Sequence, residues 1–556
     1  MAIFKLRLLA DEEQEEVRLR EELDEEPSEA RLAKRLGPTA WYWTLAVALG
    51  AALPRLYYLF RVSDPSNPGD GMYGDVYHHW QIAYLTKEIG WSHGLRLWDL
   101  KGLEYFWGIL HPWLMAAIFT ATGSIDIVQD RLLSLAFGVL AVVLVFLLCR
   151  RHWGTEVALA SAAFAALAPT SIFNDASGMV EPLGVALCLL AVWLLPRHGF
   201  LAGITWGLAT MARAEAWVFT VGLVVAVLLT REGRRQAIPL LVGWGAVMLF
   251  YMKFLLDQTG DPIYPVYWNF LANVLGKWEF TQTLTPDQRA VQPWLGVILA
   301  ISAVALAITL WKRPRPYLLL TFGFGYWVFV AGMLGFTSYL RSWVWWMPIT
   351  RVFAFPYDFA AVVLAIGLLY LAPRYLGRHV RPVSWTVVAA ALVVVQVAWL
   401  PIQSLYSGTY GTWKQTQQAG AEVAAAYHQP GIDGGAITLP SDHPNLTYAM
   451  ARFDGVQGRH LVSDMYDPFY YLPAGYSYDR NPDAIGTQMA CWFASTGTTL
   501  FVVDRQKKNY ALLLADHPGW FGHIGAVNEY DWQLYRVQAP RPSAASCKEA
   551  ARATRP

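Results

Sequence analysis

The chain has 556 residues, of which 55% are hydrophobic, 14% are aromatic and only 15% are charged. Soluble domains carry about 25% charged residues, so this composition excludes an ordinary soluble protein and indicates a polytopic membrane protein. The formal net charge of +1 gives no support for nucleic-acid binding.

The first 39 residues are a charge-rich arm, which contains the run DEEQEEVRLREELDEE. Such a run is typical of a solvated helix or a disordered tail, and we expect it in the cytoplasm. The first apolar run starts only at Trp41 and is too long for a cleavable signal peptide. The four cysteines form no CxxC or Cys/His pattern and indicate no zinc site.

Long apolar runs predict helices that cross a membrane, because a span needs about 17–25 apolar residues. We predict eleven spans, two of them short: 40–60, 129–149, 153–171, 180–196, 199–212, 216–230, 236–256, 291–311, 317–335, 353–372 and 383–402. Every second loop between these runs is rich in Lys and Arg. The positive-inside rule then places the N-terminus in the cytoplasm and the region after Pro401 outside.

One further apolar segment, Tyr105–Thr122, lies within the first outer loop, residues 61–128. Counting it as a span would put Arg150 and Arg151 outside, against the same rule. We therefore interpret it as a re-entrant or interfacial segment that packs on the bundle.

The segment Gly69–Trp80, GDGMYGDVYHHW, follows the first predicted span. It combines Asp70, Asp75, His78 and His79 with three aromatic residues, and its three glycines allow the backbone to approach a ligand closely. A carboxylate beside a bilayer is poorly solvated, which favours a functional role. The structural alternative is a surface turn in which an Asp caps a helix.

Other outer loops bring charged residues to the same predicted face. These residues are Asp175, Glu181, Arg213, Glu215, Arg341 and Arg351. A structural salt bridge is the alternative for Arg213 with Glu215. If Asp75 and Asp175 approach each other, the two like charges need a cation or a proton between them.

From Gln403 the composition changes and the long apolar runs stop. We predict a small soluble α/β domain outside the membrane over residues 403–540, followed by a disordered tail over 541–556. Its expected strands are 435–439, 499–503 and 532–537, and its expected helices are 413–428 and 508–516. Cys491 and Cys547 both lie in this outer region, where a disulfide is allowed, and the sequence leaves their pairing open.

Three stretches carry a resemblance to a known group of enzymes. They are GDVYHHWQIAYLTKEIG with the following WDLKGLEYFWGILHPWLMAAIF, then FNDASGMVEPL, and then RVFAFPYDFAAVVLAIGL. They resemble the membrane glycosyltransferases of the GT-C superfamily, and the first stretch is similar to the first outer loop of oligosaccharyltransferase catalytic subunits. The likeness covers about residues 40–400 in topology. The Trp-Trp-Asp-Tyr-Gly motif with which oligosaccharyltransferases read their acceptor is absent from this sequence, which argues against protein N-glycosylation.

The resemblance implies an all-α polytopic membrane bundle of about eleven helices with a small extracytoplasmic α/β domain. It implies inverting transfer of a sugar from a polyprenyl phosphate or pyrophosphate to a lipid, glycan or protein acceptor outside a plasma membrane. The catalytic Asp in the first outer loop of this family corresponds to Asp75.

Glycosyl transfer needs a base for the acceptor proton and positive charge for the leaving phosphate. Asp75 is the candidate base. Asp175 and Glu181 are candidates to orient the acceptor or, with Asp75, to complete a Mg²⁺ or Mn²⁺ site. The candidate substrate-binding residues are Tyr77, His78, His79, Arg213, Glu215, Arg341 and Arg351.

Two other functions stay open on the sequence alone. A lipid-linked sugar flippase or transporter would also place charges in a membrane bundle, although such folds usually contain internal repeats. A non-catalytic assembly protein would use the exported domain to bind a partner, and the aromatic, acidic segment Ser463–Tyr478 suits that role. Release of free lipid phosphate on addition of an acceptor would distinguish the enzyme from both.

Overall fold

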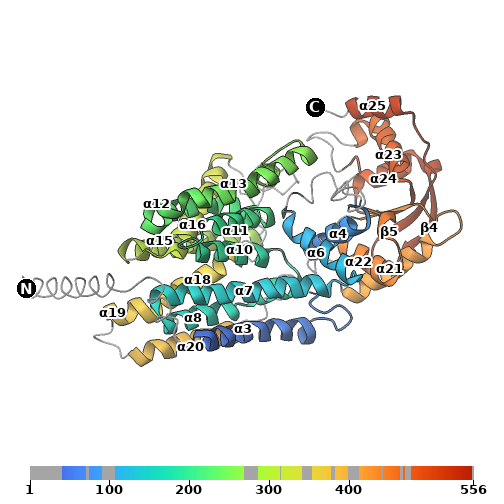
Figure 1. Ribbon diagram of the computed structural model, residues 1–556. Coiled ribbons are helices and arrows are strands. Elements are labelled where there is room, and N and C mark those ends of the chain that lie inside the picture. The colour runs from blue at the N-terminus through green and yellow to red at the C-terminus, as the bar shows by residue number, and fades with distance from the viewer. Residues whose placement is uncertain are drawn as a thin grey trace, which may run out of the picture.

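Figure 1 shows the computed structural model of the chain. It describes residues 40–70, 74–90, 105, 107–267, 286–312, 315–340, 354–376, 382–398, 412–440, 443–463, 467–469 and 478–553. A bundle of helices forms one end of the molecule and a small α/β domain forms the other, with two short helices, α4 and α6, between them (Figure 1).

The bundle is built from the apolar runs of the sequence. Its elements are α3 (Ala40–Tyr57), η1 (Tyr58–Val62), α7 (Val128–Trp153), α8 (Thr155–Ala166), α9 (Pro169–Ser177), α10 (Glu181–Leu194), α11 (Gly199–Ala212), α12 (Glu215–Leu229), α13 (Arg231–Thr259), α15 (Pro286–Trp311), α16 (Tyr317–Leu340), α18 (Ala354–Ile366), η4 (Gly367–Leu371), α19 (Ala372–Leu376) and α20 (Pro382–Ala398). Every predicted span overlaps one of these elements or a pair of them.

Length and hydropathy support fewer crossings than predicted. Within the described residues, four helical stretches are long and apolar enough to cross a membrane: Trp41–Val62, Val128–Trp153, Arg231–Thr259 and Asp358–Tyr375. The pair α8 and α9, which is bent by 60°, makes a fifth if it is one broken span, and six further apolar helices have 10–17 residues. The predicted number of about eleven spans is therefore not confirmed.

Small residues allow the bundle helices to pack closely. A Cβ at Gly222 of α12 would collide with the backbone oxygen of Thr321 in α16, and one at Gly243 of α13 would collide with that of Phe200 in α11. Glycine at such positions lets helix backbones approach in a membrane, where packing rather than water expulsion drives association.

Two short helices, α4 (Gly74–Leu85) and α6 (Leu110–Thr122), belong to the first outer loop, and η2 (Thr86–Gly90) follows α4. Helix α6 has 13 residues, which at about 1.5 Å per residue is too short for a bilayer core of about 30 Å. It packs against α4, α7 and α11, as expected of a segment that lies on the bundle rather than crossing with it.

The C-terminal domain contains one mixed sheet with the strand order β2-β1-β3-β5-β4. Strand β1 pairs in parallel with β2 and β3, and β5 pairs in antiparallel fashion with β3 and β4. Its elements are α21 (Trp413–Tyr427), β1 (Ala436–Leu439), α22 (Pro444–Phe453), η6 (Gly458–His460), β2 (Leu461–Ser463), η8 (Tyr478–Arg480), α23 (Pro482–Thr496), β3 (Thr498–Asp504), α24 (Lys508–Asp516), η9 (Pro518–Trp520), β4 (Phe521–Val527), β5 (Trp532–Val537) and α25 (Ala544–Ala553). The three predicted strands and two predicted helices of this region are confirmed.

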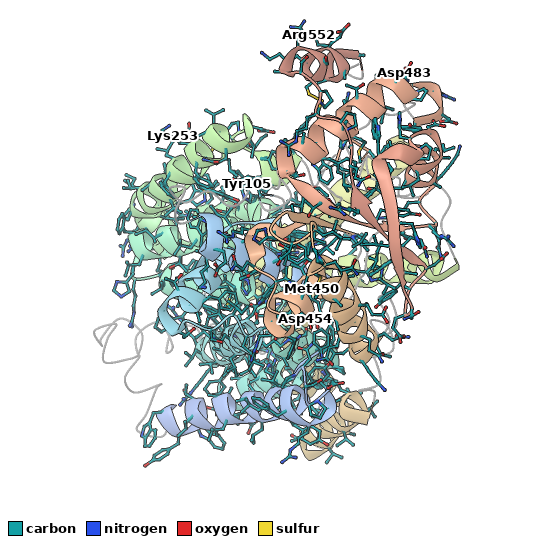
Figure 2. All side chains as sticks on the ribbon, turned by 90° about the vertical axis from the view of Figure 1, so that its right-hand side faces the viewer. Tyr105, Lys253, Met450, Asp454, Asp483 and Arg552 are labelled. Carbon is teal, nitrogen blue, oxygen red and sulfur yellow. A yellow bond between two sulfur atoms is a disulfide. The ribbon has the colours of Figure 1, made fainter. Side chains whose placement is uncertain are left out.

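The prediction of a disordered tail after residue 540 is wrong for the described part of that tail. Residues Ala544–Ala553 form helix α25, and a disulfide between Cys491 and Cys547 joins this helix to α23 (Figure 2). The amide of Gln488 also donates a hydrogen bond to the backbone oxygen of Ala550 at 2.6 Å. A segment whose polar composition predicted disorder is therefore helical and cross-linked to α23.

Candidate functional site

Helix α4 carries the predicted catalytic residue and is buried on nearly every side. Ten of its twelve residues are buried, and only Asp75 and His78 keep partial exposure. Residues three apart lie on the same face of a helix, so these two side chains mark its one accessible strip. Asp75 also lies in the first turn, where the helix dipole favours a negative charge.

The loop that precedes α4 is held by hydrogen bonds to Tyr77. The Tyr77 hydroxyl donates to Oδ1 of Asp70 at 2.7 Å and accepts from the side-chain amide of Asn67 at 2.6 Å. Burial and the Asp70 charge raise the pKa of Tyr77 well above its usual value, so the hydroxyl stays protonated and able to donate. Tyr77 was a candidate substrate-binding residue, but its side chain is 1% exposed and its hydroxyl is hydrogen-bonded to the loop.

Arg131, in the first turns of α7, connects the loop to α9. Its Nη1 donates to Oδ1 of Asn67 at 2.7 Å and also to the backbone oxygen of Pro68. Its Nε donates to the backbone oxygen of Ser177 at 3.4 Å, at the end of α9. A single guanidinium thus spans two segments, because it presents five donors in a fixed geometry.

Two glycines bring the ends of α4 and α9 together. Gly69 adopts a φ of +84°, and a Cβ there would lie 2.5 Å from the backbone oxygen of Ala176 in α9. Gly178, which ends α9 with a φ of +90°, would place a Cβ 3.3 Å from Cγ1 of Val76. Val76, which follows Asp75 in α4, therefore lies beside the turn that follows Asp175.

Asp175 itself is committed to a buried ion pair. Arg55 of α3 donates from Nε to Oδ2 of Asp175 at 2.6 Å, and these residues are 0% and 5% exposed. Nη1 of Arg55 also donates to the backbone oxygens of Ala51 and Ala166, the latter where α8 breaks before α9. Gly138 of α7 leaves the space that the Asp175 carboxylate fills. Sequence reasoning missed Arg55, which lies inside an apolar run, directly after Pro54.

Glu181, Arg213 and Glu215 form a second group. Nη2 of Arg213 lies 3.4 Å from Oε1 of Glu181, and Nε of Arg213 donates to Oε2 of Glu215 at 3.0 Å. Glu181 is 1% exposed and Arg213 is 7% exposed. The salt-bridge alternative for Arg213 with Glu215 is thus what the structure contains, and Glu181 shares the same guanidinium.

The two predicted histidines surround Trp107. His78 stacks on this indole with ring centroids 5.6 Å apart, and His79 meets it edge-on at 5.1 Å. His79 is buried, whereas His78 shares the accessible strip of α4 with Asp75. His78 is therefore the histidine that is placed to reach a ligand beside Asp75.

A buried pair that the sequence did not single out lies behind this group. Nε2 of His111, at the start of α6, is 3.2 Å from Oδ1 of Asp130 and 3.3 Å from Oγ of Ser134. Arg131, which follows Asp130 in the chain, donates its hydrogen bonds to the loop before α4. In the sequence, the feature that could have pointed to this buried pair is His111-Pro112 within an apolar run.

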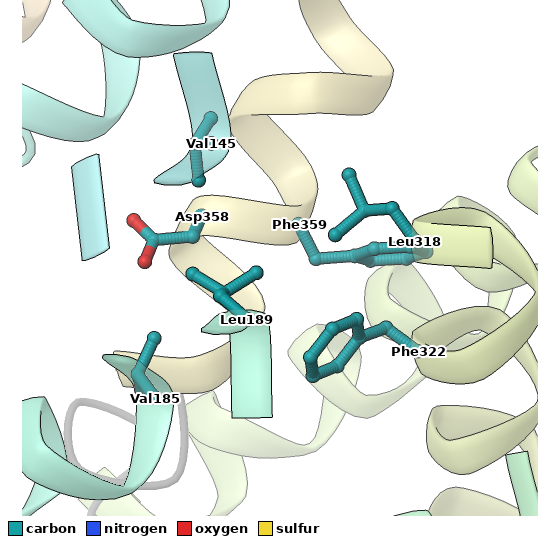
Figure 3. A pocket seen from close by; sticks show the side chains of 7 residues that line it. All are labelled: Val145, Val185, Leu189, Leu318, Phe322, Asp358 and Phe359. Carbon is teal, nitrogen blue, oxygen red and sulfur yellow. The ribbon is translucent and has the colours of Figure 1, made fainter. Parts of the chain in front are cut away.

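Asp358 is a further carboxylate that the analysis of the sequence passed over. It is 7% exposed, on α18, and lies within electrostatic range of Asp175 and Arg55. It borders a small pocket with a volume of about 10 Å³ (Figure 3). The other lining residues are Val145, Val185, Leu189, Leu318, Phe322 and Phe359. A carboxylate inside an apolar run, RVFAFPYDFAAVV, was the available signal.

The metal site predicted at Asp75 and Asp175 stays a prediction. Across the described residues, no group of three or more His, Cys, Asp or Glu side chains could hold a metal ion. The Asp175 carboxylate, one of the two expected ligands, accepts a hydrogen bond from Arg55. Arg341 and Arg351, the other candidates for binding the leaving phosphate, lie outside the described residues.

Part of the chain that contributes to this site matches a known protein family. Residues 108–255, less than half of the chain, match the family described as Dolichyl-phosphate-mannose-protein mannosyltransferase. The resemblance to the GT-C glycosyltransferases is thereby confirmed. The matched GT-C segment includes Asp175, Glu181 and Arg213, and Asp75 precedes it.

Among solved structures, the chain is similar to the archaeal oligosaccharyltransferase AglB from Archaeoglobus fulgidus in complex with an inhibitory peptide and a dolichol-phosphate. The identity is 14% and the TM-score 0.48, over 91% of this chain and 76% of that one. It is also similar to ArnT from Cupriavidus metallidurans bound to undecaprenyl phosphate, with 15% identity and a TM-score of 0.45, over 91% of this chain and 100% of that one. No curated protein sequence matches the chain.

Proposed function

We propose that this protein is a multi-pass membrane glycosyltransferase that moves a sugar from a polyprenyl-phosphate or pyrophosphate donor to an acceptor on the extracytoplasmic face. The observation that carries the proposal is the placement of Asp75. It is a carboxylate on the one accessible strip of an otherwise buried helix, next to the turn that ends α9. The match of residues 108–255 to a family named for transfer from a dolichyl-phosphate sugar supports the donor class.

In the proposed reaction the acceptor oxygen attacks the anomeric carbon from the face opposite the phosphate. The new carbon–oxygen bond forms as the bond to the phosphate oxygen breaks, and the lipid phosphate leaves with that electron pair. Asp75 takes the acceptor proton as general base, and His78 lies on the same strip to orient the acceptor or the sugar. Displacement from the opposite face inverts the anomeric configuration.

The departing phosphate needs positive charge. Arg213 is proposed for this role together with Arg341 and Arg351. Arg213 already forms ion pairs with Glu181 and Glu215. Its contribution to phosphate binding therefore depends on how far these ion pairs open when the phosphate binds. Asp175, which is paired with Arg55, is proposed to position the end of α9 rather than to contact the acceptor.

The proposed orientation puts the N-terminal arm in the cytoplasm and the C-terminal domain outside. Two contacts between distant loops support it. Nη1 of Arg315 donates to the backbone oxygen of Leu229, and Nζ of Lys312 lies 5.7 Å from the centre of the Trp153 ring. These contacts gather the basic turns at the end of the bundle that lies opposite α4 and the C-terminal domain (Figure 1). The positive-inside rule assigns such an end to the cytoplasm.

The deciding experiment measures the product that a flippase would not make. Membranes from cells that lack the chain supply donor and acceptor together, and the purified protein is added to their detergent extract. Wild-type protein should release free polyprenyl phosphate or pyrophosphate. The variant Asp75→Asn should release it at least about 10²-fold more slowly, the usual contribution of a general base.

The control variant is Asp64→Asn, which removes an exposed carboxylate from the same outer loop. Among the described residues, the Asp64 carboxylate accepts hydrogen bonds from Ser66, so its replacement by an amide should leave the rate unchanged. Full turnover by Asp75→Asn would show that another group is the base. Release by no variant, the wild type included, would favour the flippase or the non-catalytic protein.

A further inference from the structure

The C-terminal domain covers one side of the helix that carries Asp75. Trp413, the first residue of α21, stacks on Tyr77 with ring centroids 6.3 Å apart and planes 8° from parallel. Tyr448 of α22 lies 4.9 Å from Trp80 in an edge-on arrangement and 5.9 Å from Tyr77. We call Trp413 and Tyr448 the aromatic clamp.

The clamp packs mainly with the outer loop, and both of its rings also contact Phe453 of their own domain. Trp413 and Tyr448 belong to one hydrophobic cluster with Tyr77, Trp80 and Tyr84 of α4. The sheet and its helices have two separate clusters, which contain neither clamp residue. Burial of these two rings therefore stabilises the placement of α4 more directly than it stabilises the domain that supplies them.

Polar contacts fix the same interface. The backbone amide of Gly458 donates to the Tyr84 hydroxyl at 2.8 Å, and a Cβ on Gly458 would lie 2.6 Å from Cε1 of Tyr84. Arg452 of α22 lies 3.5 Å from Asp126, beside the start of α7. The domain is thus in contact with the outer loop near the C-terminal end of α4 and beside the start of α7.

Helix α4 depends on this cover. It has twelve residues, and a helix of that length is marginal in water without tertiary packing. Its large rings Tyr77, Trp80 and Tyr84 are at most 6% exposed, and clamp residues or Gly458 contact all three. Without the clamp, one whole side of the helix would face water.

We propose that Trp413 and Tyr448 are positioning residues of the transferase, in that the aromatic clamp of the exported domain sets where α4 presents Asp75. This inference rests on the proposed function, since it assigns a task to Asp75. The exported domain is then part of the catalytic site, and a displacement of α4 by about 1 Å is enough to cost about 10²-fold in rate.

The first measurement needs no activity. Hydrogen–deuterium exchange of the intact protein reports on the amides of residues 74–85. Tyr448→Ala should speed their exchange by at least about tenfold, because exchange follows local opening. Tyr448→Phe keeps the ring and should match the wild type. Gly458→Ala, which deletes nothing and adds one methyl against Tyr84, should also speed exchange in α4.

The matched control is Tyr510→Ala. Tyr510 is a buried tyrosine of the same domain that packs on Phe501 and Phe469, in a cluster remote from α4. This variant should speed exchange around β3 and α24 and leave residues 74–85 protected. It separates loss of the clamp from general loosening of the exported domain.

The second measurement is turnover, as release of free lipid phosphate. Tyr448→Ala should lower the rate at saturating lipid extract by about 10²-fold, with little change in the extract concentration that gives half the maximal rate, since α4 is displaced and the lipid site is not. Tyr448→Phe should restore the rate, and Tyr510→Ala should keep it.

Three results would overturn the inference. They are full protection of α4 in Tyr448→Ala, an open α4 with undiminished turnover, or an equal loss of turnover in Tyr510→Ala. A wild type that releases no lipid phosphate would overturn the proposed function instead, and the exchange data would still show whether the clamp holds α4.

Discussion

At the scale of single residues, Arg131 decides the geometry of the outer loop. It is 1% exposed and donates to Asn67, Pro68 and Ser177. Asn67 and Ser177 are buried and lie on segments far apart in sequence, and Pro68 is partly buried. A residue with this role need not touch substrate to be required for activity.

Replacement of Arg131 should therefore destabilise the protein. Arg131→Met leaves several buried acceptors without a donor and should lower the free energy of unfolding by roughly 3–5 kcal/mol, at about 1–3 kcal/mol for each group. Arg131→Lys should not rescue it, because an ammonium cannot span the same acceptors in a fixed fork. Thermal unfolding of the purified protein measures the loss, with exposed Arg552→Met as control. A midpoint like that of the wild type would contradict this role.

Asp454 gives a prediction about pH. Burial raises the pKa of this carboxyl above its usual range, and its Oδ2 has no hydrogen-bond partner among the described residues. A group whose pKa is higher in the folded state stabilises the protein below the unfolded pKa of about 3.9, and this contribution is lost as the pH rises through the folded value. Asp454→Asn should thus raise the unfolding midpoint at pH 7 and lose that advantage near pH 4. An advantage that is the same at both values would exclude this cause.

Metal removal is a third test at this scale. Because the Asp175 carboxylate is engaged by Arg55, we expect turnover to survive treatment with EDTA. The measurement is release of free lipid phosphate before and after chelation, followed by readdition of Mg²⁺ or Mn²⁺. Loss of activity that either ion restores would contradict this expectation and support the metal site predicted from the sequence.

At the scale of elements, periodicity and local composition predicted the helices and strands better than they predicted which distant residues are in contact. The apolar runs predicted the helices of the bundle, and alternation predicted β5 at Trp532–Val537. Asp75 was predicted as either a base or a residue at a helix start, and it does lie in the first turn of α4. Local patterns carry this information because side-chain period follows backbone geometry.

Contacts between residues far apart in the chain could not be predicted from such local patterns. Arg55 and Asp175 are 120 positions apart, and Tyr84 and Gly458 are 374 apart. No local pattern distinguishes an arginine that will meet a carboxylate from one that will face headgroups. The prediction of a disordered tail was wrong for a similar reason, because α25 is bonded to Cys491, a partner 56 residues away in the chain.

Helix α25 provides the prediction at this scale. The disulfide closes a separation of 56 residues, for which chain entropy gives a stabilisation of about 4 kcal/mol, within the usual range of 2–4. The double variant Cys491→Ala with Cys547→Ala should lower the unfolding midpoint of the exported domain and expose α25 to protease. Turnover should change little, since this helix lies far from α4 (Figure 1). A protease-resistant α25 in the double variant would show that packing alone orders it.

At the scale of the whole molecule, basic turns and the C-terminal domain lie at opposite ends. Within the described residues Cys149 and Cys188 are buried and Cys491 and Cys547 are bonded, so a single added cysteine gives a clean label. In intact cells a membrane-impermeant maleimide should react with Lys508→Cys in the exported domain. It should react with Arg235→Cys, at the basic end, only after permeabilisation. The reverse pattern would invert the proposed topology.

The contact between Tyr84 and Gly458 also has a consequence for biogenesis. The 374 positions between them take about 20–75 s to synthesise at roughly 5–20 residues per second. On the proposed topology, the outer loop crosses the bilayer before the C-terminal domain that covers it has been synthesised. Tyr77, Trp80 and Tyr84 of α4 then lack their contacts with Trp413, Tyr448 and Gly458 until that domain folds.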